Sequence, residues 1–168
     1  MALVADANAG LLAARRATIL QLRAPERSAR ELESEATELV ASSPVPVIIS
    51  SRCDIALASG AAGVNLPERD IAVRDARAML GQRLIGRSVH SVEAARQAER
   101  DGADFVIFGP VWESESHPGS VPAGVDALAA VARELSIPVL AIGGVTEDRI
   151  AICHDAGAAG FAAIRLFQ

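Results

Sequence analysis

The feature that most constrains the fold of this chain is an alternation of short apolar segments with helical patterns along almost all of its 168 residues. Eight segments have the apolar, β-branched character of buried strands. They lie at 3–5, 18–22, 45–49, 63–66, 84–88, 105–108, 139–142 and 160–164. Helical patterns occupy 28–41, 53–59, 72–80, 92–101, 123–135 and 147–156, whereas 8–16 has room for only about two turns.

Apolar strands joined by helices predict a parallel sheet that is covered on both faces. Eight such units predict an α/β protein with one domain over 1–168, a (β/α)₈ barrel of the TIM type. The chain is shorter than the roughly 200 residues that such barrels usually need. We therefore expect a compact barrel with a shortened first helix and no final helix. A doubly wound open sheet is the alternative, but no GxGxxG motif follows the first strand.

The composition excludes several classes of function. All 16 basic residues are arginine, so neither a Schiff-base lysine nor a Walker A lysine is available. The net charge is −5 and the arginines are scattered, which argues against a nucleic-acid partner. No apolar run is long enough for a membrane span, and we expect a cytoplasmic protein. Cys53 and Cys153 form no CxxC pair and are predicted to be reduced, buried thiols.

In a barrel, chemistry takes place at the carboxyl ends of the strands. Gly143 and Gly144 end the seventh predicted strand, where exposed amides can bind a phosphate; a tight turn that needs positive φ is the alternative. Asp70 follows the fourth strand and is either a Mg²⁺ ligand or a helix cap. Arg23 and Arg52 are candidates for a bidentate phosphate contact, although arginines at such places are often surface residues.

Two of the three histidines lie where they could transfer a proton. His90 follows the fifth strand, and a hydrogen-bonding role in the core is its alternative. His117 lies in the loop after the sixth strand, together with Ser114 and Ser116, and that loop is otherwise an exposed connection. His154 falls within a predicted helix and is interpreted as a surface or packing residue.

Several segments at the strand ends together resemble the thiamine phosphate synthase and TenI family. They are QLR at 21–23, GRSVHS at 86–91, GADFVIFGPVWES at 102–114, HPG at 117–119 and IPVLAIGGVT at 137–146. The resemblance implies a (β/α)₈ barrel. Synthases of the family use Mg²⁺ to join a pyrimidine diphosphate to a thiazole phosphate, through ionisation of the pyrimidine and capture by the thiazole nitrogen. The TenI branch includes a tautomerase that moves a proton to aromatise a thiazole phosphate carboxylate.

The chain departs from the synthase pattern where that pattern holds the diphosphate and its metal. The Glu-Lys pair that follows QLR in synthases is Ala24-Pro25 here, and the Asn-Asp before Arg52 is Ser50-Ser51. Asp70 matches the second acidic ligand of the family. In the loop after the sixth strand, the Thr-x-Thr-Lys of the synthases reads 114–117 as Ser-Glu-Ser-His.

The resemblance also implies which residues bind the thiazole phosphate. These are Gly143, Gly144 and Ile164, and we add Ser88 and Gly124 as candidate substrate-binding positions. Two departures concern the tautomerase: Pro110 stands where TenI enzymes carry a histidine, and Arg165 stands where a serine is usual.

The kept and lost residues favour a TenI-like thiazole tautomerase without a cofactor, with His117, His90 and Gln21 as catalytic residues. One alternative is a thiamine phosphate synthase that uses Mg²⁺. The other is a pseudoenzyme that binds the phosphorylated thiazole without turnover. The shortened ends of the barrel would leave apolar surface bare, so we also expect a homo-oligomer.

Overall fold

The computed structural model describes residues 1–114, 119 and 121–168, and its eight strands follow one another in sequence order around one parallel sheet. The strands are β1 (Ala2–Val4), β2 (Leu20–Leu22), β3 (Val47–Ser50), β4 (Gly63–Leu66), β5 (Leu84–Val89), β6 (Phe105–Phe108), β7 (Val139–Ile142) and β8 (Gly160–Ala162). A parallel bridge between Ala2 and Ala163 joins the first strand to the end of the last. This bridge closes the barrel, and the predicted fold class is confirmed.

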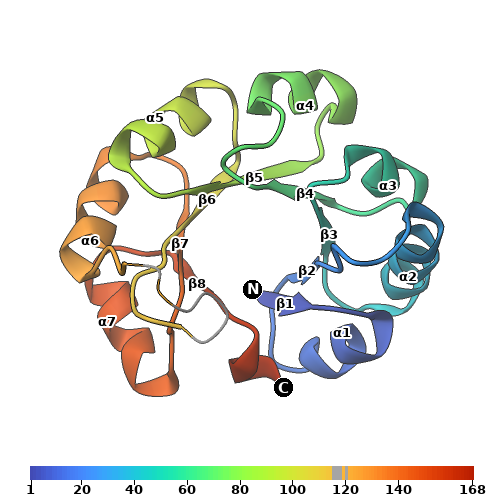
Figure 1. Ribbon diagram of the computed structural model, residues 1–168, viewed down its shortest axis with the longest axis horizontal. Helices are drawn as coiled ribbons and strands as arrows, with labels where there is room; N and C mark the ends of the chain where they lie inside the picture. Colours follow the sequence, from blue (N-terminus) through green and yellow to red (C-terminus); the bar gives the residue numbers. More distant parts are fainter. Residues whose placement is uncertain (115–118, 120) are drawn as a thin grey trace.

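The helices form a ring outside the strands (Figure 1). They are α1 (Ala7–Ala13), α2 (Ala29–Ser42), α3 (Cys53–Ala58), α4 (Val73–Leu80), α5 (Val92–Arg100), α6 (Val125–Glu134) and α7 (Ile150–Asp155), with the 3₁₀ turns η1 (Glu147–Arg149) and η2 (Arg165–Phe167). In the described part of the chain, no helix has the length and apolar character that crossing a membrane requires. The helix predicted at 147–156 begins as the 3₁₀ turn η1.

The core has two layers, because successive side chains of each strand point to opposite faces of the barrel wall. Residues such as Val64 and Leu66 pack outward beneath the helices. The inner layer includes Ile48, Phe105 and Ile107, which fill the barrel. Gly86 leaves room for this filling, since a Cβ there would lie 2.2 Å from the Phe105 ring.

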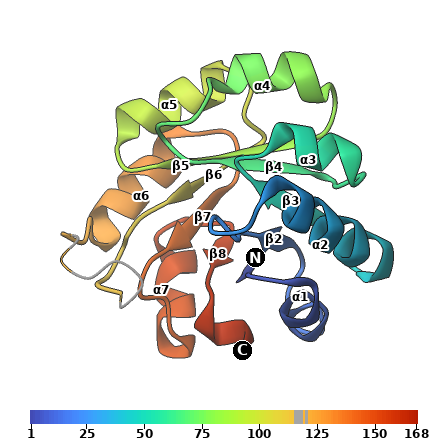
Figure 2. The same cartoon turned by 45° about the vertical axis from the view of Figure 1, so that its right-hand side comes forward.

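The first and last elements of the chain lie at one flank of the barrel (Figure 2). α1 spans seven residues, and only the turn η2 follows β8. The ring of Phe167 in η2 stacks on that of Phe161 in β8, with centroids 5.9 Å apart. This stack covers part of β8.

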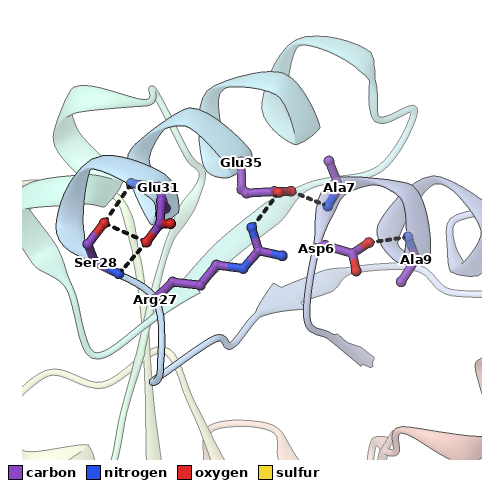
Figure 3. A network of polar contacts seen from close by, with 7 residues as sticks. All are labelled: Asp6, Ala7, Ala9, Arg27, Ser28, Glu31 and Glu35. Carbon is purple, nitrogen blue, oxygen red and sulfur yellow. Dashed lines mark hydrogen bonds and ion pairs between the residues drawn. The ribbon is translucent and has the colours of Figure 1, made fainter.

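A network of polar contacts fixes the first turns of α1 and α2 (Figure 3). The Ala9 amide donates to Asp6, which caps α1, and the Ala7 amide donates to Glu35 of α2 at 2.7 Å. Arg27 pairs with the same Glu35 carboxylate at 2.6 Å. A helix as short as α1 is not stable alone. These contacts with α2 therefore help to hold the first turn of α1 in place after β1.

Candidate active site

All eight strands are parallel, so their carboxyl ends share one rim of the barrel. Side-chain contacts link successive strand ends around this rim. Ser51 after β3 donates to Asp70 after β4, and Asn65 of β4 donates to Ser88 of β5 at 3.1 Å. The segments after β6 and β7 are joined in turn, because the Trp112 amide donates to the Gly143 carbonyl at 3.0 Å. Neighbouring strand ends are therefore linked from β3 to β5 and from β6 to β7.

Asp70 has both carboxylate oxygens engaged by the protein. Oδ2 accepts from the Ser51 hydroxyl, and Oδ1 accepts from the Ile71 amide at 2.7 Å. Within residues 1–114, 119 and 121–168, no three His, Cys, Asp or Glu side chains are arranged to hold a metal ion. These residues do not fit the Mg²⁺ site with two carboxylates that the family resemblance implies for a synthase.

The barrel floor beneath this rim carries two buried amide side chains. Gln21 of β2 is 2% exposed and Asn65 is 3% exposed. Neither Gln21 Oε1 nor Asn65 Oδ1 has a hydrogen-bond partner among the residues that the structure describes. Buried carbonyl oxygens are nearly always paired, so these two mark a place where a ligand could donate. Asn65 was not among the predicted binding residues. The signal available in the sequence was a polar residue within the apolar run of β4.

The Gly143-Gly144 turn packs closely against the loop that follows β6. A Cβ on Gly143 would lie 2.6 Å from Pro110, and one on Gly144 would lie 2.4 Å from the Glu113 carbonyl oxygen. In the described part of the chain, neither glycine amide donates to the backbone. Both glycines have positive φ, 91° at Gly143 and 65° at Gly144, as the tight-turn interpretation requires. Binding of a phosphate by their amides stays a prediction.

Arg149 fixes the turn from its other side. Its Nη1 donates to the Gly144 carbonyl at 2.7 Å, and its guanidinium lies 5.0 Å from the Trp112 ring centroid. A cation over an indole is attracted by the ring face. Arg149 therefore connects the loops after β6 and β7, and sequence patterns did not single it out.

His90 lies exposed at the end of β5, and its Nδ1 contacts the Gly109 carbonyl oxygen. A carbonyl only accepts, so Nδ1 carries the proton and Nε2 of the neutral ring keeps a lone pair. The His90 amide donates to Glu68 at 3.1 Å. The ring is thus oriented by the backbone of the β6 loop, as a proton-transferring histidine would require.

The two predicted arginines differ in their surroundings. Arg52 forms a two-point contact with Asp54, at 2.8 and 2.5 Å, and this pairing lowers the pKa of the Asp54 carboxyl. An anion would have to compete with Asp54 for that guanidinium. Arg23 is exposed, and its side chain contacts no partner among the described residues. Burial, with the charges of Asp70 and Asp54, raises the pKa of the Cys53 thiol, so this thiol stays protonated near neutral pH.

The remaining candidates lie in or after the loops of β6 and β8. Ser114 is half-buried, and Ile164 is 37% exposed just before η2. The Gly124 amide already donates to the Val111 carbonyl at 3.1 Å, so Gly124 orders the start of α6. Ser116 and His117 lie outside the described residues, and their predicted roles stay predictions.

Comparisons with known proteins agree with this barrel fold. The sequence matches the family described as Thiamine monophosphate synthase over residues 3–167. The chain belongs to this family. It is 39% identical over 152 residues to the thiamine-phosphate synthase of Chloroflexus aurantiacus. The aligned region covers 88% of this chain and 70% of that protein. It is 38% identical over 152 residues to the putative thiamine-phosphate synthase 2 of Aquifex aeolicus, covering 89% and 82% of the two chains.

Solved structures give the same result. The thiamine phosphate pyrophosphorylase of Pyrococcus furiosus superposes with a TM-score of 0.87 at 27% identity, covering 97% of this chain and 84% of that one. FabK of Thermotoga maritima, at 18% identity and a TM-score of 0.80 over 99% of this chain and 58% of that one, shares the fold alone. Thiamine-phosphate synthase relatives support a place in thiamine biosynthesis. They favour the synthase over the tautomerase and do not distinguish a TenI branch.

Proposed function

We propose that this chain joins an aminopyrimidine, carried as its diphosphate, to a phosphorylated thiazole, which is the reaction of a thiamine-phosphate synthase. The bond between the pyrimidine methylene carbon and the diphosphate oxygen breaks, and its electron pair leaves with the diphosphate. The thiazole nitrogen then donates its lone pair to that carbon, forming the new C–N bond. The relatives named as thiamine-phosphate synthases support this assignment over the tautomerase.

The observation that carries the proposal is the pair of unpartnered oxygens on the barrel floor. A buried carbonyl oxygen left without a partner costs roughly 1–3 kcal/mol, so a ligand that donates N–H groups to Gln21 Oε1 and Asn65 Oδ1 regains that energy. A phosphorylated thiazole has no N–H group. The exocyclic amine of the thiamine pyrimidine has two, so the chemistry of this floor suits the pyrimidine.

The phosphate of the second substrate has a different place to bind. Gly143 and Gly144 lie after β7, at the rim above the barrel floor. In the described part of the chain, their amides donate to no backbone carbonyl. Phosphate oxygens accept from such amides, and the missing Cβ allows a close approach. A heterocycle in the barrel and a phosphate at this turn would bring the two substrates together at the rim.

A coupling assay tests the proposal. The purified protein is incubated with the pyrimidine diphosphate and the thiazole phosphate, and thiamine phosphate is measured by chromatography. Gln21→Met removes the acceptor with little change of volume, and we expect it to weaken pyrimidine binding at least about tenfold, the loss of one hydrogen bond. Gln82→Met, at an exposed position, serves as the control. No product from the wild type, or equal pyrimidine binding by both variants, would contradict the proposal.

The tautomerase remains a second candidate because of His90. Its Nε2 is left as the basic nitrogen when Nδ1 binds the Gly109 carbonyl. Aromatisation of a thiazole phosphate carboxylate, followed by ultraviolet absorbance with wild type and His90→Gln, measures this activity directly. Binding of thiazole phosphate by calorimetry without turnover in either assay would instead indicate the pseudoenzyme.

A further inference from the structure

We infer that the Ser51 hydroxyl takes the role of a divalent cation in fixing Asp70, so that the rim of this barrel binds its anionic ligands without a metal ion. The inference rests on the proposed function, because it concerns how the same site holds a phosphorylated substrate. It differs from the Mg²⁺ dependence that the family resemblance implies for a synthase.

Both oxygens of the Asp70 carboxylate already accept from protein donors. One oxygen accepts from the Ser51 hydroxyl and the other from the Ile71 amide. A magnesium ion would have only the remaining lone pair of each oxygen to bind. Mg²⁺ also sheds its water reluctantly and is usually held by one or two carboxylates together with substrate phosphates.

Two other acidic side chains after β3 and β4 have protein partners of their own. Asp54 is held by the Arg52 guanidinium at two points, and Glu68 accepts from the His90 amide. Within the described residues no group of three His, Cys, Asp or Glu side chains is arranged to hold a metal ion. Where the family resemblance implies a second carboxylate beside Asp70, this chain has Ser51.

Ser51 has an unusual backbone conformation, because it is the one non-glycine residue with positive φ in the described chain, at 70°. The Arg52 amide donates to the Ser50 carbonyl at 2.8 Å, so Ser51 is the centre of a γ-turn. Such a conformation is unfavourable for serine and persists where surrounding contacts require it. Here the side chain emerging from that turn is the one that binds Asp70.

Protein groups alone already order the loop that carries Asp70. Arg87 of β5 donates to the carbonyls of Ile71 at 2.7 Å and Glu68 at 2.8 Å. It also lies 3.4 Å from the Asp70 carbonyl oxygen. This guanidinium adds a positive charge beside the loop, which disfavours a divalent cation. No ion is needed to give the loop its shape.

Titration with Mn²⁺, followed by electron paramagnetic resonance, tests the inference without any activity measurement. We expect the wild type and Ser51→Ala to leave Mn²⁺ free. Ser51→Asp restores a second carboxylate at a position whose positive φ aspartate tolerates, and we expect it to bind Mn²⁺ at least about tenfold more tightly. Adding Asp70→Asn to Ser51→Asp should abolish that gain.

Tight Mn²⁺ binding by the wild type that Asp70→Asn removes would overturn the inference, and so would an unchanged affinity in a folded Ser51→Asp variant. Calorimetry with the pyrimidine diphosphate alone, in EDTA and in Mg²⁺, gives a second reading that needs only the wild type. Equal affinities support metal-free binding, whereas a loss in EDTA contradicts it. Failure of the coupling reaction together with silent Mn²⁺ spectra would refute the proposed function and leave this inference standing.

Discussion

At the scale of single residues, the turn after β7 shows how close packing can dictate a glycine. Gly144 has φ of 65°, and a Cβ there would lie 2.4 Å from a carbonyl oxygen and 2.7 Å from Trp112 Cβ. Gly60 has nearly the same φ, 72°, but nothing lies within 4 Å of its virtual Cβ. The two positions therefore separate the effect of backbone conformation from the effect of contact.

We predict that Gly144→Ala lowers the free energy of unfolding much more than Gly60→Ala does. Left-handed φ costs an alanine roughly 1–2 kcal/mol at either site, and overpacking adds roughly 1–3 kcal/mol at Gly144 alone. Urea unfolding of the two variants and the wild type measures the difference. Equal losses would mean that the loop after β6 moves away without cost.

At the scale of secondary-structure elements, the start of α2 is stabilised by a capping box. The Ser28 hydroxyl donates to Glu31 Oε2 at 2.6 Å, and the Ser28 amide donates to the same oxygen at 2.8 Å. Reciprocal contacts of this kind satisfy amides that the first turn leaves without partners. Because Glu35 on the same helix binds the first turn of α1 (Figure 3), this cap supports both helices.

Removing the cap should destabilise the protein. We expect Ser28→Ala to lower the free energy of unfolding by about 1 kcal/mol, the usual cost of losing an N-cap side chain. Ser34→Ala, at an exposed position within the same helix, is the control and should change stability little or raise it slightly. Similar urea midpoints for the two variants would show that the cap contributes nothing.

The cap also makes stability depend on pH. Hydrogen bonds from Ser28 lower the pKa of Glu31 below its ordinary value of 4.5. A depressed pKa in the folded state adds stability above the unfolded value, and this stability is lost as pH falls through the folded pKa. The stability gap between wild type and Glu31→Gln should therefore narrow between about pH 5 and about pH 3. A constant gap in urea unfolding over this range would contradict the assignment.

At the scale of the whole molecule, the barrel closes through the bridge between Ala2 and Ala163. The stack of Phe167 on Phe161 covers part of the flank, and Arg16 after α1 pairs with Glu147 of η1 at 3.3 Å. Leu12 of α1 still has 63% of its surface exposed. Apolar surface of this kind is often covered by a partner.

We therefore predict that the protein forms a homo-oligomer. Multi-angle light scattering at micromolar concentration should give a mass at least twice the 17.4 kDa of one chain. A mass of one chain over that range would refute the prediction. The cytoplasmic location expected from the composition likewise stays a prediction.

Local sequence was enough to predict the barrel because period and polarity are properties of neighbouring residues. The strands at 63–66, 105–108 and 139–142 have the predicted bounds, since apolar runs in a parallel sheet are buried on both faces. The turn at Gly143 and Gly144 was also predictable, because adjacent glycines after an apolar run are typical of a turn. Each of these features depends on a few adjacent letters.

Contacts between distant segments could not be predicted in this way. Nothing near Ser51 in the sequence indicates that its hydroxyl contacts Asp70, which lies 19 residues further along the chain. The unpartnered oxygens of Gln21 and Asn65 also result from folding. Their strands, β2 and β4, lie on either side of β3 in the sheet. Alternation along the chain decides which residues are buried, whereas closure of the sheet decides which of them meet. The chemistry of a barrel rim depends on contacts between residues that are distant in the sequence, and therefore on the tertiary structure.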